Sequence, residues 1–124
     1  MSKTILIVED SDACVTTLEI SILSIPGVCV RTAYTAREAM KVLLEGKVDA
    51  MLTDLHMPRV DGFELIAEVR SHPDYAKIPI IVISGDSDPR TPDKVRKAGA
   101  NAHFLKPYSP VQIRRTLEQF LYAH

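Results

Sequence analysis

The sequence predicts an α/β fold in which five parallel strands form one sheet, in the order 2-1-3-4-5, with five helices covering both faces. Along the chain, short apolar runs alternate five times with segments of helical periodicity, as in repeated strand-helix units. Four of the runs, residues 5–8, 50–53, 80–83 and 102–105, largely lack the alternating polar residues of a sheet with one face in water, which favours buried parallel strands. Right-handed crossovers then place helices on both faces and reverse the strand order beside the first strand.

The first strand is predicted over residues 5–8, and the helix after it begins at Ser11 or Asp12 and runs to about Leu23. Small polar residues at such a start accept hydrogen bonds from the first backbone amides of a helix. The Pro-Gly pair at residues 26–27 ends this helix. Its apolar face comprises Val15, Leu18 and Ile22.

The second strand is predicted over residues 28–33, and the next helix lies between Thr35 and Gly46. Thr35 and Glu38 have the spacing of a capping box, and a glycine just past the last turn is typical of a helix end. The third strand leads to Asp54, and a further helix follows it. The apolar faces of these two helices comprise Ala39, Val42 and Leu43, and Phe63, Ile66 and Val69.

The fourth strand is predicted over residues 80–83, and a short helix then runs from Thr91 to Gly99. A proline just inside its start and a glycine just past its end fit the two termini of a helix. The fifth strand is predicted over residues 102–105. The last helix begins with a second capping box, from Ser109 to Gln112, and its apolar face comprises Ile113, Leu117, Phe120 and Leu121.

Length and composition fit one globular domain over residues 1–124. The chain has 15 basic and 16 acidic side chains and a net charge of −1, so no overall charge draws it to nucleic acid or to a membrane. The apolar runs are only strand-length and no apolar leader precedes the first, so we expect a cytoplasmic protein without membrane insertion. Cys14 and Cys29 lie apart, and we expect both to be reduced and buried.

Polar residues of different chemical kinds follow four of the apolar runs. Glu9 and Asp10 follow the first strand, Asp54 the third, Ser84 the fourth and Lys106 the fifth. The carboxyl ends of parallel strands form the ligand-binding crevice of such a sheet, and the predicted order puts the first and third strands side by side. We therefore expect three carboxylates, a hydroxyl and an ammonium to share one pocket.

These groups suit a hard cation and a phosphoryl group. Crowded carboxylates repel one another unless a proton or a cation intervenes, and a set of oxygen ligands favours Mg²⁺ or Mn²⁺. Mg²⁺ commonly completes its coordination with phosphate oxygens. An aspartate such as Asp54 can attack phosphorus, while Lys106 and the metal balance charge and Ser84 binds a phosphoryl oxygen.

Over its whole length the chain resembles the receiver domains of response regulators from bacterial two-component signalling systems. The markers are Val8-Glu9-Asp10, residues 53–62, Ile83-Ser84-Gly85 and Lys106-Pro107. Each marker alone is weak, whereas all four, in order and at the ends of predicted strands, are specific. The resemblance implies a flavodoxin-like fold and a phosphorylation-dependent switch, not an enzyme that turns over an external substrate.

For the acceptor, the resemblance implies that Asp54 takes a phosphoryl group from a phosphohistidine of a sensor histidine kinase or a histidine phosphotransfer protein. It implies that Asp10, Asp54 and the backbone carbonyl of His56 bind Mg²⁺ directly and that Glu9 acts through a water molecule. His56 and Asp86 flank the site in the family's pattern, where such residues tune the lifetime of the phosphate before autodephosphorylation.

For the switch, the resemblance implies that Lys106 pairs with the phosphoryl group, that its bond to Pro107 is cis, and that Ser84 moves toward the phosphate. One position departs from the usual pattern. Three residues before the lysine, the family usually has a tyrosine or phenylalanine that turns inward when the serine moves, and here the residue is His103. A histidine can fill that gap, but it is smaller, more polar and titratable.

Charge is uneven along the chain. Residues 91–124 carry six basic and two acidic side chains, and residues 1–90 carry nine and fourteen. In the family, the fourth helix, fifth strand and fifth helix form the output surface, which would be basic here. We expect it to bind an acidic partner or a second copy of the chain, with a solvated helix face as the alternative. We expect no direct binding to nucleic acid, because the sequence holds no helix-turn-helix segment or basic arm.

Other functions fit the sequence less well. A phosphatase similar to the haloacid dehalogenases would need a second aspartate two residues after the nucleophile, where His56 stands. A nucleotide-binding domain would need a glycine-rich phosphate loop. A receiver-like interaction module that acts without phosphate stays open, although such members usually lack the acceptor, an acid or the lysine. Taken singly, Glu9, Asp10 and Asp54 could also be ordinary loop acids.

Overall fold

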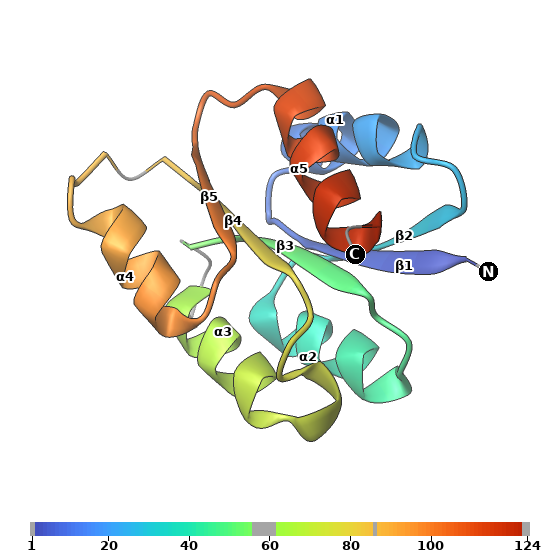
Figure 1. Ribbon diagram of the computed structural model, residues 1–124, viewed down its shortest axis with the longest axis horizontal. Coiled ribbons are helices and arrows are strands. Elements are labelled where there is room, and N and C mark those ends of the chain that lie inside the picture. Colours follow the sequence, from blue (N-terminus) through green and yellow to red (C-terminus); the bar gives the residue numbers. More distant parts are fainter. Residues whose placement is uncertain (1, 56–61, 86, 123–124) are drawn as a thin grey trace.

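The computed structural model of the protein describes residues 2–55, 62–85 and 87–122 (Figure 1). His56 and Asp86 lie outside the described residues, so the expectations for them stay predictions. Five strands form one sheet in the order β2-β1-β3-β4-β5, and every neighbouring pair is parallel. This confirms the predicted fold class. The strands are β1 (Lys3–Val8), β2 (Val28–Ala33), β3 (Ala50–Asp54), β4 (Ile80–Ser84) and β5 (Ala102–Leu105).

Helices cover both faces of the sheet, with α1 and α5 on one face and α2 and α3 on the other (Figure 1). Among the described residues, no helix is both long and apolar enough to cross a membrane. A short 3-10 helix, η1, precedes β4 and was not predicted. The helices are α1 (Asp12–Leu23), α2 (Ala36–Glu45), α3 (Gly62–Ser71), η1 (Pro73–Tyr75), α4 (Thr91–Ala98) and α5 (Pro110–Tyr122).

Side chains of the central strands alternate between two apolar cores. In β1, Ile5 and Ile7 pack with residues of α1 and α5, and Leu6 and Val8 pack with residues of α2 and α3. Strands β3 and β4 are buried throughout, because helices exclude water from both faces of the sheet. The sheet therefore holds the carboxyl ends of β1, β3 and β4 in fixed positions.

The predicted helix caps are present. Ser11, not Asp12, is the N-cap of α1. At the start of α2, the Thr35 hydroxyl accepts a hydrogen bond from the Glu38 amide at 3.1 Å, and the Glu38 carboxylate accepts one from the Tyr34 amide at 2.8 Å. Because these side chains satisfy the first amides of each helix, the helices begin at defined residues just after the strand ends.

Three predictions of burial were wrong, and each concerns an edge or an outer surface. β5 is an edge strand, its residues are at most half-buried, and Leu105 is 46% exposed. β2 forms the other edge, where Cys29 is exposed, while Cys14 is partly buried. Both cysteines are free thiols, as expected. On α5, Phe120 is 37% exposed, because only part of its apolar face contacts the sheet.

Candidate functional site

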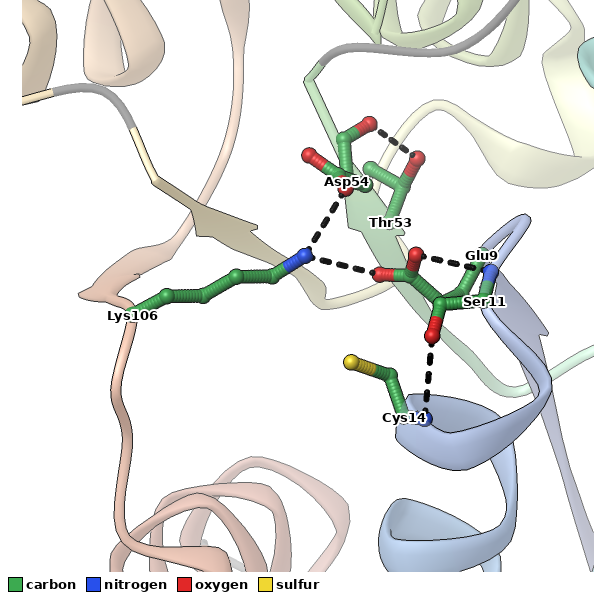
Figure 2. Close-up of polar contacts among 6 residues, drawn as sticks. All are labelled: Glu9, Ser11, Cys14, Thr53, Asp54 and Lys106. Carbon is green, nitrogen blue, oxygen red and sulfur yellow. Dashed lines mark hydrogen bonds and ion pairs between the residues drawn. The ribbon is translucent and has the colours of Figure 1, made fainter.

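The carboxyl ends of three strands bring the predicted acidic and basic residues together (Figure 2). Glu9 follows β1, Asp54 is the last residue of β3, and Lys106 follows β5. In the pairing of β1 with β3, Val8 lies opposite Thr53, so the next residue of each strand is an acid. The strand order and the register thus create the acidic cluster, although the two acids lie far apart in the sequence.

The acidic cluster consists of Glu9, Asp10 and Asp54. One carboxylate oxygen from each residue lies within 4.8 Å of the other two. Glu9 and Asp54 are only 3% and 7% exposed, whereas Asp10 is exposed. Two buried carboxylates beside a third on the surface form a site that opens to solvent on one side, with a concentration of negative charge that favours a cation.

Lys106 supplies a positive charge to the two buried acids. Its Nζ atom lies 3.0 Å from Asp54 Oδ2 and 3.3 Å from Glu9 Oε2 (Figure 2). The side chain extends from the segment after β5 across the ends of β4 and β3, and it is 28% exposed. The ammonium therefore lies where it can contact both the acidic cluster and a group bound to Asp54.

Burial and charge act together on the titration of this cluster. Burial raises the pKa of Glu9 above its ordinary value and the charge of Asp54 raises it further, while Lys106 and the backbone amide of Ser11 oppose the rise. For Lys106, burial alone lowers the pKa, but the hydrogen bond to Asp54 and the charges of Asp54 and Glu9 outweigh burial and raise it. The lysine therefore stays charged at neutral pH.

The raised pKa of Glu9 predicts how pH affects the stability of the Glu9→Gln variant. Below the ordinary pKa of 4.5, Glu9 is protonated in both the folded and the unfolded chain, and the variant has no advantage. As the pH rises, the unfolded chain loses this proton first, so the wild-type protein loses stability relative to the neutral glutamine. Urea unfolding of both proteins without metal, from pH 4 to pH 7, should show the variant gaining stability over the wild type. A constant difference would contradict the account.

Close contacts join the end of β3 to the start of α3. The Thr53 hydroxyl donates to the Asp54 carbonyl at 2.9 Å, and the Gly62 amide donates to the Leu55 carbonyl at 2.7 Å. A Cβ atom at Gly62 would lie 2.6 Å from the Asp54 carbonyl oxygen, so α3 can start this close to the site only with glycine. In the sequence, Gly62 indicated only the shape of a loop.

Ser84 and His103 lie on the two strands that flank the site on its other side. Ser84 is fully buried at the end of β4, opposite Leu105, and its carbonyl accepts the Lys106 amide at 2.8 Å. His103 lies on β5 opposite Val82 and is partly buried. Ser84 is therefore linked to Lys106 through the backbone, and His103 lies one strand further toward the edge of the sheet.

Tyr108 is a neighbour of the site that the sequence did not indicate. Burial raises its pKa to about 12, with further contributions from Cys14 and Glu9 and an opposing one from Lys106. The ring packs against the core beneath α1 and α5. In the sequence, only its position two residues after Lys106 indicated that Tyr108 lies near the site. The peptide bond between Lys106 and Pro107 is cis, as expected.

The acidic cluster fits a hard divalent cation. Its three residues offer carboxylate oxygens, which are the ligands that Mg²⁺ and Mn²⁺ prefer. The Lys106 ammonium bridges two of these carboxylates, which indicates that the cluster needs positive charge to be stable. Asp10 is exposed and Asp54 is buried, so a cation could enter the cluster from solvent and be held beside Asp54.

Known proteins match the chain over most of its length. Residues 5–118 match the sequence profile of the response regulator receiver domain. The transcriptional regulatory protein KdpE of Staphylococcus aureus is 35% identical over 127 residues, which cover 100% of this chain and 53% of that protein. The chain thus spans about half the length of this relative.

Solved structures of response regulators have the same fold. The chemotaxis response regulator CheY4 of Vibrio cholerae superposes with a TM-score of 0.88 at 26% identity, covering 98% of this chain and 100% of that chain. The phosphorylated cyanobacterial phytochrome response regulator RcpA superposes with a TM-score of 0.85 at 25% identity, covering 99% of this chain and 96% of that chain.

Proposed function

The chain belongs to the family of response regulator receiver domains of two-component systems, and from this premise we propose that it is a switch that accepts a phosphoryl group on Asp54. The observation that carries the proposal is the position of the Lys106 ammonium, 3.0 Å from Asp54 and 3.3 Å from Glu9. A phosphoryl group transferred to Asp54 would need positive charge at this place, and the Lys106 ammonium supplies it.

In the proposed reaction a carboxylate oxygen of Asp54 attacks the phosphorus of a phosphohistidine on a kinase or phosphotransfer protein. The new bond joins that oxygen to phosphorus, the phosphorus–nitrogen bond breaks, and the electron pair returns to the imidazole, which takes a proton from water. The product is an aspartyl phosphate. Lys106 is already charged and can pair with a phosphoryl oxygen without first gaining a proton.

We propose that Glu9, Asp10 and Asp54 hold Mg²⁺ or Mn²⁺, with the backbone carbonyl of His56 as a further ligand. When bound, the ion would neutralise negative charge on the acidic cluster and the phosphoryl group. Ser84 would bind a phosphoryl oxygen, and His103 would respond to that change. The roles of His56 and Asp86 in the phosphate lifetime, and autodephosphorylation itself, stay predictions.

A thermal unfolding experiment tests the metal site. Because a ligand that binds only the folded state stabilises it, Mg²⁺ at ten times its dissociation constant should add about 1.4 kcal/mol and raise the melting temperature by about 3 to 6 °C. Asp10→Ala should lose most of this response, whereas Asp74→Ala, a change at an exposed acid of η1, should keep it. Equal responses in all three proteins would contradict the proposed site.

The output surface is proposed to be the face of α4, β5 and α5. Its exposed basic residues include Lys94 and Lys97 on α4 and Arg115 on α5. Two further arginines form ion pairs within their own helices, Arg96 with Asp93 and Arg114 with Glu118. These pairs use both acids of residues 91–124, so the surplus of basic residues counted in the sequence remains, and it suits an acidic partner or a second copy of the chain.

Charge reversal tests this surface. Replacing Lys94, Arg96 and Arg115 with glutamate should weaken binding of the output partner and any self-association of the phosphorylated chain, because the favourable charge is inverted. Sedimentation velocity of the chain with Mg²⁺ and beryllofluoride, a mimic of the bound phosphoryl group, measures self-association directly. Partner binding and self-association that are both unchanged by the reversal would count against this surface.

The proposed chemistry also implies a place in the cell. A phosphohistidine donor takes its phosphoryl group from ATP, so a chain that depends on this donor would work in the cytoplasm. We propose accordingly that residues 1–124 act there as one receiver domain, and that phosphorylation changes the affinity of the output surface by favouring one of two conformations.

A further inference from the structure

Arg70 lies in the last turn of α3 and contacts two segments that follow it in the chain, η1 and the connection between α4 and β5. Its Nε and Nη2 atoms donate to the Gly99 carbonyl at 3.0 and 2.7 Å, and Nη2 also donates to Asn101 Oδ1 at 3.0 Å. Its Nη1 atom donates to the Tyr75 carbonyl at 3.2 Å. A guanidinium has five N–H donors in a planar fork, which lets one side chain fix several acceptors at once.

The residues that accept these bonds are themselves held in place. Gly99 is the C-cap of α4 in the left-handed region, at φ +115°, and a Cβ atom there would lie 3.1 Å from Arg70 Cγ. Asn101 pairs with Ile80 through both its backbone and its side chain, at 2.8 and 2.9 Å. Arg70 therefore joins the end of α3 to the end of α4 and, through Asn101, to the start of β4.

The segment that Arg70 holds also forms a wall of a groove between α4 and β5. The groove has a volume of about 300 Å³, and its lining includes Arg96, Ala100, Asn101 and His103. It thus lies on the proposed output surface and reaches the residue that stands at the family's switch position. Arg70 does not line the groove but contacts Asn101, which does.

At the other end of α4, Asp88 makes contacts within its own segment: its backbone carbonyl accepts a hydrogen bond from the Thr91 amide at 3.0 Å. The Arg90 side chain pairs with Asp88 at 2.8 Å and does not cap the helix. α4 has eight residues, too few for a stable isolated helix, and it is positioned by packing of Thr91 and Val95 and by its fixed C-terminal end. Its orientation, and with it the width of the groove, depends strongly on the junction at Gly99.

We propose that Arg70 is the positioning residue of the groove between α4 and β5: through Gly99 and Asn101 it sets the shape that this groove presents to a partner. The proposal rests on the proposed function, because it assigns the groove to the output surface. It places control of that surface in a residue that lies outside the acidic cluster and does not line the groove.

Amide NMR spectra and hydrogen exchange of Arg70→Gln and Arg70→Lys test the proposal. Gln lacks the guanidinium fork and cannot reach all the acceptors of Arg70. Hydrogen exchange of the Asn101 amide should therefore rise about tenfold, and the amide signals of Ala102 and His103 should shift or broaden. Lysine keeps the charge but has one ammonium, so it should restore the wild-type signals only in part. Arg37→Gln, at an exposed arginine on α2, is the matched control and should leave the groove unchanged.

The same samples with Mg²⁺ and beryllofluoride separate this proposal from the proposed function. Binding of beryllofluoride should shift amide signals near Asp54 equally in all the variants, while the response at His103 should be smaller in Arg70→Gln than in the wild type. Wild-type groove signals and a full His103 response in Arg70→Gln would overturn the role of Arg70. If even the wild-type protein failed to bind beryllofluoride, the phosphoryl switch would fail, and a groove changed in Arg70→Gln would still support the structural junction.

Discussion

Changing Asp54 to asparagine is expected to abolish phosphoryl uptake from acetyl phosphate and from any phosphohistidine donor. The amide has nearly the same size as the carboxylate, but it is neutral and its oxygen is a poor nucleophile toward phosphorus. Asp54 lies 3.0 Å from Lys106 within the acidic cluster, and Glu9, which also contacts Lys106 at 3.3 Å, is the nearest alternative carboxylate. Intact-mass spectrometry after incubation with acetyl phosphate and Mg²⁺ measures the loss.

The control for this change is Asp74→Asn, which makes the same chemical substitution at an exposed acid of η1. It should take up one phosphoryl group, as the wild type should. Uptake by Asp54→Asn at the wild-type level would mean that another residue is the acceptor. A wild type that neither forms an adduct nor binds beryllofluoride would favour the interaction module that acts without phosphate.

Changing Lys106 to alanine is expected to have the second largest effect, and it acts on both stability and phosphorylation. Without metal, loss of the ammonium leaves the buried carboxylates of Glu9 and Asp54 facing each other, which should cost about 2 kcal/mol of unfolding free energy at neutral pH. The rate of phosphorylation should fall about a hundredfold, because the charge that would stabilise the transferred group is missing.

Urea unfolding and the rate of adduct formation measure these two effects. Lys41→Ala, at an exposed lysine of α2, is the matched control and should change neither quantity by much. Mg²⁺ should recover part of the stability lost in Lys106→Ala, since a cation can relieve the same repulsion. A Lys106→Ala protein that is phosphorylated as fast as the wild type would show that the lysine contributes nothing to the transfer.

The sequence predicts the fold of this chain well because its local signals agree with one another. The caps at Ser11 and Thr35 and the glycine at Gly99 mark helix ends that the structure has at the same residues. Right-handed crossovers require helices on both faces and a reversal of strand order, and 2-1-3-4-5 is one of the common orders that meet this requirement.

The errors arise where a local pattern cannot tell the centre of a sheet from its edge. The run that became β5 is as apolar as a central strand, yet one of its sides lacks a neighbouring strand, and Leu105 is 46% exposed. Cys29 is exposed on the opposite edge for the same reason. Phe120 is 37% exposed on α5, whereas its neighbour Leu121 packs against the core, so the apolar run at the end of the helix is only partly covered.

The candidate site could be predicted from the sequence because strand ends are easy to locate and the acids stand directly at them. Gly62, Tyr108 and Arg70 could not be predicted in the same way. Each depends on contacts between distant segments: Gly62 with the Asp54 carbonyl, Tyr108 with α1, and Arg70 with the end of α4. Such contacts depend on the packing of whole elements and have no local pattern in the sequence.

Phosphorylation of Asp54 is tested most directly by identifying the residue that carries the phosphoryl group. The wild-type protein is incubated with acetyl phosphate and Mg²⁺, treated with borohydride, which reduces an aspartyl phosphate to homoserine, and then digested for peptide mass spectrometry. We expect homoserine at position 54 and at no other aspartate. Reduction at a different residue, or a phosphate adduct that borohydride leaves intact, would contradict this expectation.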